Sequence, residues 1–186
     1  MSRMLAYALL LFAFNFAAAQ AQSPTDGCTK AHVYVNSYFH FTYAWPSILQ
    51  PYDTSALGLG PGFPYRNEFM LFAAREGDEP YGIVMLAERL NYPTPHLPKG
   101  IRDSTDFLDR FMRFRPDEQV TSISKKHFTS ANGLVFDEVD YMQNGGYSSG
   151  VITTIGKFLI VVKCNEKSAS ELAEMTQSVA AIQVRR

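Results

Sequence analysis

The sequence predicts an α+β domain in which helices flank a mostly antiparallel β-sheet. Three observations lead to this expectation. Short segments with alternating apolar and polar residues dominate the chain, turn residues join most of them as hairpins, and two segments with helical spacing lie between and after them. Aromatic residues form 13% of the sequence, which is enough to fill a sizeable core.

The first strands are expected in residues 31–46, AHVYVNSYFHFTYAWP, which alternate and are rich in valine, phenylalanine and tyrosine. A break near Asn36 and Ser37 either divides this segment into two strands or bends a single one. Pro46 ends it, because proline cannot donate a hydrogen bond to a sheet.

Four aromatic residues stand at alternate positions within this segment, and we call them the aromatic ladder: Phe39, Phe41, Tyr43 and Trp45. Alternate side chains of a strand point to the same face, so the ladder is either a platform for sugars or bases or one wall of the core. Four exposed rings in a row would create an apolar surface patch of roughly several hundred Å², and soluble monomeric proteins avoid patches of this size. The core interpretation is therefore favoured.

The remaining elements follow from hydrophobic periodicity. Further strands are expected at residues 66–75, 81–90, 119–130, 134–142, 147–155 and 157–164. Helices are expected at residues 103–114 and 168–182. The second helix opens on Ser168 and Glu171, a capping box in which each residue satisfies a backbone N–H group of the first turn.

The N-terminus has the features of a signal peptide. Arg3 precedes the apolar stretch 4–19, and small residues around Ala19 fit a cleavage site. An uncleaved anchor helix is the alternative. We expect residues 1–21 to be the signal peptide, residues 22–186 to be a single domain without a membrane span, and the protein to be periplasmic or secreted.

The segments YVNSYFHFTYAWPS (34–47) and GLVFDEVDYM through SASELAEMTQSVAAI (133–182) resemble the opening and the end of the PsbP-like family. The resemblance spans nearly the whole mature chain and rests on pattern. It implies an antiparallel sheet flanked by helices. Family members include a photosystem II lumen subunit and small exported bacterial proteins, so it also implies a binding or assembly module without catalytic residues.

Two loops rich in glycine, proline and tyrosine, residues 50–65 and 91–100, are the best candidates for ligand or partner binding. Binding residues concentrate on loops that a rigid scaffold holds, and tyrosine is a favoured contact residue. Their candidate residues are Tyr52, Phe63, Tyr65, Tyr92 and His96. The alternative is that these rings pack back onto the domain.

Glu138 and Asp140 lie two residues apart on one strand, so that their carboxylates share a face. They can share a hard cation with loop carbonyls, or they are two exposed acids on an outer strand face. The segment GYSSG (146–150) matches the nucleophile motif of serine hydrolases, but it occupies a hairpin and is interpreted as the start of a strand.

The two cysteines, Cys28 and Cys164, are expected to form a disulfide, because an exported chain enters an oxidising compartment. Such a bond would join the start of the first strand to the end of the last. The alternative is a buried free thiol at Cys164 and a loose N-terminal residue at Cys28.

The charge balance, 17 basic against 18 acidic residues, gives no basic patch for nucleic acid. We therefore expect an exported non-enzymatic binding or assembly module that takes an unknown protein or small-molecule partner in the cell envelope and needs no cofactor. The alternative is a small hydrolytic or metal-assisted enzyme that uses Glu138, Asp140 and a loop histidine such as His96.

Overall fold

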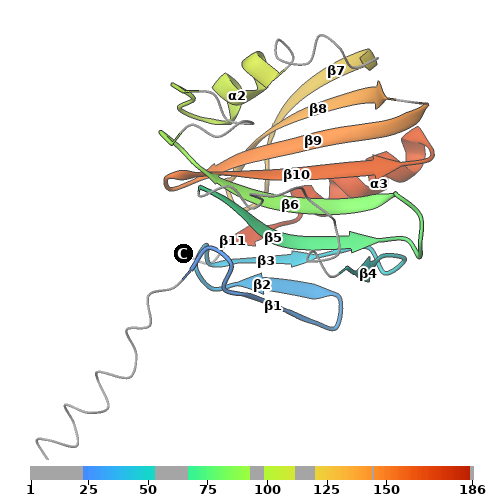
Figure 1. Ribbon diagram of the computed structural model, residues 1–186, viewed down its shortest axis with the longest axis horizontal. Helices are drawn as coiled ribbons and strands as arrows, with labels where there is room; N and C mark the ends of the chain where they lie inside the picture. The colour runs from blue at the N-terminus through green and yellow to red at the C-terminus, as the bar shows by residue number, and fades with distance from the viewer. Residues whose placement is uncertain (1–22, 53–66, 93–98, 112–119, 144, 185–186) are drawn as a thin grey trace, which may run out of the picture.

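Two antiparallel sheets form the framework of the protein (Figure 1), in a computed structural model that describes residues 23–52, 67–92, 99–111, 120–143 and 145–184. The larger sheet contains, in spatial order, β4 (Gln50–Pro51), β5 (Glu68–Arg75), β6 (Gly82–Arg89), β10 (Phe158–Glu166), β9 (Gly146–Ile155), β8 (Val135–Gln143) and β7 (Val120–Thr129). The smaller sheet contains β1 (Gly27–Lys30), β2 (Val33–Asn36), β3 (Phe41–Ala44) and β11 (Gln183–Val184).

In the part of the chain that the structure describes, each face of the large sheet carries one helix. The short helix α2 (Ser104–Phe111) packs against β8 and β9, and the longer helix α3 (Ala169–Ala180) contacts β9, β10 and β3. The face of the large sheet that meets α3 and the small sheet is called the inner face here, and the face under α2 is the outer face. The expected α+β architecture, an antiparallel sheet flanked by helices, is confirmed.

The aromatic ladder lies in the interior, as expected. All four of its side chains are at most 5% exposed, and Tyr43 is completely buried. The rings cross the gap between the two sheets: the centroid of the Trp45 ring lies 4.8 Å from that of Phe72 on β5, and that of Phe39 lies 5.1 Å from that of Phe158 on β10. The ladder is therefore the wall of the core that joins the small sheet to the large one.

The break near Asn36 is a true boundary between β2 and β3. The Asn36 side chain is fully buried, and its Oδ1 atom accepts a hydrogen bond from the Phe39 backbone N–H at 2.9 Å. Its Nδ2 atom donates to the Pro24 carbonyl at 2.8 Å and to the Tyr34 hydroxyl at 2.9 Å. One amide thus shapes the turn and holds the N-terminal segment, because a buried amide must satisfy its donors and acceptor.

Ser168 caps the start of helix α3 as predicted, whereas the contact of the Glu171 carboxylate is with the Ser168 hydroxyl. The Ser168 hydroxyl accepts a hydrogen bond from the Glu171 backbone N–H at 3.3 Å and donates one to the Glu171 carboxylate at 2.8 Å. Leu172, Met175 and Val179 of this helix are buried in the core. This amphipathic face holds α3 against the inner face of the large sheet.

The expected disulfide is absent, and both cysteines are free. Cys28 is exposed on β1, the outermost strand of the small sheet, whereas Cys164 is completely buried on β10 near the middle of the large sheet. The prediction was wrong because it treated the strand of Cys164 as the neighbour of the first strand. The Cys28–Val35 pairing places Cys28 in the other sheet.

The predicted signal peptide, residues 1–21, lies outside the described residues. Within the described part of the chain, no helix combines the length and the apolar character that a membrane crossing requires.

Replacing Phe41 with alanine should lower the free energy of unfolding by about 3–5 kcal/mol, since the change empties a buried ring site. Chemical denaturation of the purified protein measures this loss. The neighbouring change Thr42→Ala, on the opposite and half-buried face of β3, provides the control. A loss below about 0.5 kcal/mol for F41A, the range of surface substitutions, would contradict the placement of the ladder in the core.

Candidate functional site

Several polar and charged side chains lie together on the inner face, at one end of the large sheet. The ends of β8 and β10 and the beginnings of β9 and α3 lie together at this end (Figure 1). Because side chains alternate along a strand, Phe136, Glu138 and Asp140 of β8 all point to the inner face. Phe136 belongs to the core, and the two acids continue that row toward the end of the sheet.

Lys126 on β7 lies between the two carboxylates. Its Nζ atom is 3.0 Å from Glu138 Oε1 and 2.7 Å from Asp140 Oδ2. The antiparallel register produces this arrangement, since it pairs Lys126 with Glu138 and Ser124 with Asp140. The Ser124 hydroxyl also donates to Asp140 Oδ2 at 3.1 Å. We call Ser124, Lys126, Glu138 and Asp140 the acid–lysine cluster.

Burial and hydrogen bonding together shift the pKa values of the two acids in opposite directions. It raises the pKa of Glu138 above its usual value, and the hydrogen bond from Lys126 only partly opposes this effect. Burial is also the largest single influence on Asp140 and acts to raise its pKa, but the hydrogen bonds from Lys126, Ser149 and Glu138 and the charge of Lys126 together outweigh it, so the pKa is lowered. The Asp140 bond in turn raises the pKa of Lys126. Asp140 is therefore the main anionic partner of the lysine.

A cavity of about 320 Å³ opens beside this cluster, between α3 and the β7–β8 hairpin. The acid–lysine cluster forms its polar wall. Met142, Tyr147, Leu172 and Ala173 contribute its less polar side. A site with a few charged groups against an apolar wall is typical of ligand-binding pockets.

A second polar group lies next along the same end of the sheet. Glu166, at the end of β10, is only 4% exposed, and its pKa is raised to about 7. Burial is the main cause, and the negative charges of Glu171 and Glu76 add to it. Lys167 opposes the shift, and it lies 3.7 Å from Glu76 and over the ring of Tyr81. This glutamate therefore changes its charge close to neutral pH.

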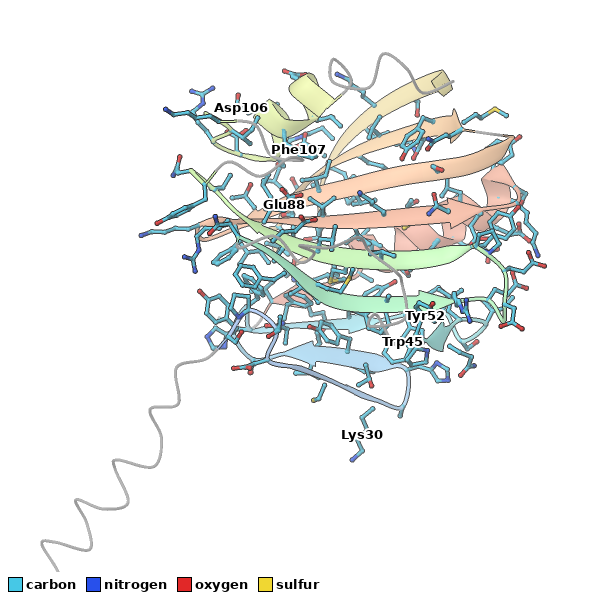
Figure 2. The ribbon with its side chains drawn as sticks, in the orientation of Figure 1. Lys30, Trp45, Tyr52, Glu88, Asp106 and Phe107 are labelled. Atoms are coloured by element: carbon cyan, nitrogen blue, oxygen red, sulfur yellow. The ribbon has the colours of Figure 1, made fainter. Side chains whose placement is uncertain are left out.

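Tyr52 lines a smaller cavity at this end of the sheet, of about 130 Å³. The Arg75 guanidinium stacks over the Tyr52 ring at 4.1 Å, and Tyr81 and Asn165 complete the surroundings. Figure 2 shows Tyr52 at the end of the sheet opposite to Glu88 and Phe107. The predicted loop residue Tyr52 is thus half-buried against the sheet and lies beside a cavity.

Tyr92 does not join Tyr52. It follows β6 and is half exposed, with the Arg89 guanidinium 5.5 Å from its ring. The pairing of β5 with β6 places Arg75 and Arg89 at opposite ends of the hairpin, so the two tyrosines are far apart. The other predicted loop residues, Phe63, Tyr65 and His96, lie outside the described residues.

The expectation for Glu138 and Asp140 needs one correction. Glu138 is 5% exposed, so it is not an exposed acid on an outer face, because α3 covers this part of the sheet. In the part of the chain that the structure describes, no group of three or more histidine, cysteine or acidic side chains has the arrangement of a metal site. Lys126 takes the position between the carboxylates that a shared cation would need.

The sequence analysis missed Lys126 and a second hairpin pair. His127 Nδ1 lies 3.0 Å from the buried Asp137 Oδ1, and the Thr105 hydroxyl of α2 donates to Asp137 Oδ2 at 3.1 Å. The hairpin register was the available signal, since β7 and β8 are joined by the short segment 130–134. Ser148 and Ser149 of the GYSSG segment are buried in β9, which confirms its interpretation as a strand.

An antiparallel two-sheet framework with a helix on each face of the large sheet defines the class of fold, and comparison with known proteins identifies it as PsbP-like. The solution structure of cyanobacterial PsbP (CyanoP) from Synechocystis matches with a TM-score of 0.57 and 15% sequence identity, over 88% of this chain and 100% of that chain. The resemblance expected from the sequence is confirmed at the level of the fold. No family model and no curated protein matches the sequence.

Changing Glu166 to glutamine should stabilise the protein at about pH 8 but not at about pH 4.5. The folded pKa of about 7 exceeds the ordinary value of 4.5, so the folded state binds more protons than the unfolded state between these values. Stability is therefore lost as pH rises through this window, and E166Q removes that loss. Melting temperatures across the window measure the difference.

Glu174→Gln is the matched control, because Glu174 is an exposed carboxylate on the same helix as Glu171. A melting-temperature difference between E166Q and the unaltered protein that stays constant from acid to alkaline pH would show that Glu166 does not titrate in this way.

Proposed function

We propose that the protein is an exported, non-enzymatic binding module, and that its partner occupies the cavity between α3 and the β7–β8 hairpin. The observation that carries this proposal is the cavity itself. It is about 320 Å³ in volume, and it joins three charged side chains to the apolar surface of Met142 and Leu172. Such a site fixes a ligand by a few polar contacts and holds it by apolar contact.

The hydrogen bonds of the acid–lysine cluster favour binding over hydrolysis. Both carboxylates accept hydrogen bonds from Lys126, and the Ser124 hydroxyl donates a hydrogen bond to Asp140. Asp140 is held as an anion by two donors, and the Lys126 ammonium compensates the charge of both carboxylates. This arrangement is that of an ion-pairing site.

Two further observations support the export and the binding role. The signal-peptide features of residues 1–21 support delivery to the periplasm or the cell exterior. The protein shares its fold with cyanobacterial PsbP (CyanoP), and the resemblance of its sequence to the PsbP-like family implies a binding or assembly role. The partner is a protein or a small molecule of the cell envelope.

Site-specific photocrosslinking tests the proposal. The cavity-lining, exposed residue Ala173 is replaced by the photoreactive residue p-benzoylphenylalanine, and intact envelopes are irradiated. The same replacement at Lys30, exposed on β1 and far from α3, is the control (Figure 2). We expect a discrete adduct from position 173 that is absent at position 30, or a bound small molecule in native mass spectra of protein isolated from the envelope.

Equal adduct patterns from positions 173 and 30, together with native spectra that contain the bare chain only, would overturn the assignment of the cavity as the binding site.

A further inference from the structure

The acid–lysine cluster already holds one alkylammonium group, which is the end of the Lys126 side chain. This group contacts both carboxylates, at 3.0 Å from Glu138 and at 2.7 Å from Asp140. The Lys126 side chain is 56% exposed, whereas the Glu138 side chain is 6% exposed. The acids are therefore fixed by the fold, and the cation reaches them from the solvent side.

The cluster also has more acceptors than the lysine satisfies. Asp140 Oδ1 and the hydroxyl of Ser149, which is 1% exposed, are both buried and form no hydrogen bond of ordinary geometry to a described residue, although Ser149 lies close enough to Asp140 to help lower the pKa of that carboxyl. Asp140 and Ser149 lie directly opposite each other in the β8–β9 pair, so both side chains point into the cluster. A buried carboxylate oxygen without a donor is costly, and a group that brings N–H donors relieves that cost.

The charge and the shape of the site agree with this requirement. Two carboxylates and one lysine leave the cluster with a net negative charge when both acids are ionised. Leu172, Ala173 and Met142 provide the apolar side of the adjoining cavity, which at about 320 Å³ exceeds the roughly 150 Å³ that suffices for benzene. A ligand that combines a cationic head with an alkyl chain matches both walls.

We infer that the cavity binds an alkylammonium or alkylguanidinium group, whose N–H donors replace those of Lys126 at Glu138 and Asp140. The inference rests on the proposed function, since it names the ligand class of the same cavity. Lys126 acts as an internal competitor that occupies the acids while the site is empty. The group is either a free small amine or the side chain of a lysine or arginine on a partner protein.

If Lys126 competes with the ligand, its removal should have an effect on amine binding that is opposite to the usual one. Removing a lysine ordinarily leaves amine binding unchanged or disturbs the fold, but here Lys126→Met should strengthen it. An exposed ion pair is weak, so its loss as a competitor raises the affinity by about two- to fivefold. Asp140→Asn should weaken binding by about tenfold, because it removes the charge-assisted hydrogen bonds.

Lys125→Met is the matched control. Lys125 is the adjacent residue of β7, and its Nζ atom lies 3.4 Å from Asp109 of α2 on the outer side of the sheet. This variant removes the same positive charge from the opposite face, so it separates a change in net charge from the loss of the competitor. It should leave the affinity for amines unchanged.

The experiment is an NMR titration of the purified protein with n-butylammonium and n-butylguanidinium. Butanol, which has no charge, and tetramethylammonium, which has no N–H donor, are the negative controls. We expect the amides of Glu138, Asp140 and Ser149 to shift with the two donors only, with tighter binding in K126M and unchanged binding in K125M. A capped Gly-Lys-Gly peptide that binds tighter than butylammonium indicates a protein side chain as the source, and equal or weaker binding indicates a free amine.

Equal binding of tetramethylammonium, or an affinity in K126M that is no higher than in the unaltered protein, would overturn the inference. If neither cation binds while position 173 still gives its specific adduct, the ligand class is wrong and the proposed function stands.

Discussion

The fold depends on covering the inner face of a seven-stranded sheet with two elements of different kinds. The small sheet covers one part through the aromatic ladder, whose Trp45 and Phe39 rings pack against Phe72 and Phe158. Helix α3 covers the other part with Leu172, Met175 and Val179. Fully buried rings of this kind stabilise a domain by several kcal/mol each, at about 3–5 kcal/mol for phenylalanine. A hydrogen bond of 3.0 Å between the Tyr43 and Ser178 hydroxyls joins the two covers.

The candidate site lies where the side chains on the inner face of the large sheet change from apolar to polar. On β8 the inward row runs from Phe136, in the core, to Glu138 and Asp140, beside the first turns of α3. Burial under the helix acts to raise the pKa of both acids, and stronger hydrogen bonding to Asp140, chiefly from Lys126 of the neighbouring strand, makes them unequal. The same end of the sheet carries Glu166, so the cavity and a glutamate that changes charge near neutral pH share one scaffold. This proximity follows from the way in which β8, β9, β10 and α3 meet.

Periodicity predicted the long elements and the core, because strands and helices of eight or more residues impose a clear pattern on the sequence. It did not predict the division into two sheets. β1, β4 and β11 have two to four residues each, and β11 pairs with β3 across most of the chain, as Gln183 does with Thr42. The disulfide was expected wrongly for the same reason, since Cys28 belongs to the small sheet. The acids were found from their spacing, but Lys126 was missed because its role appears only when the β7–β8 register is followed across the turn.

The central claim is that the fold makes Glu138 and Asp140 into an unequal acid pair around one cationic group. A carbon-detected NMR titration of their side-chain carboxyl groups measures this directly. The account predicts that Glu138 titrates above its ordinary value of 4.5 and that Asp140 titrates below its ordinary value of 3.8. In Lys126→Met the midpoint of Asp140 should move upward, because its main hydrogen-bond donor is lost. Two carboxyl groups that titrate together at their ordinary values, unchanged by removal of the lysine, would contradict the account.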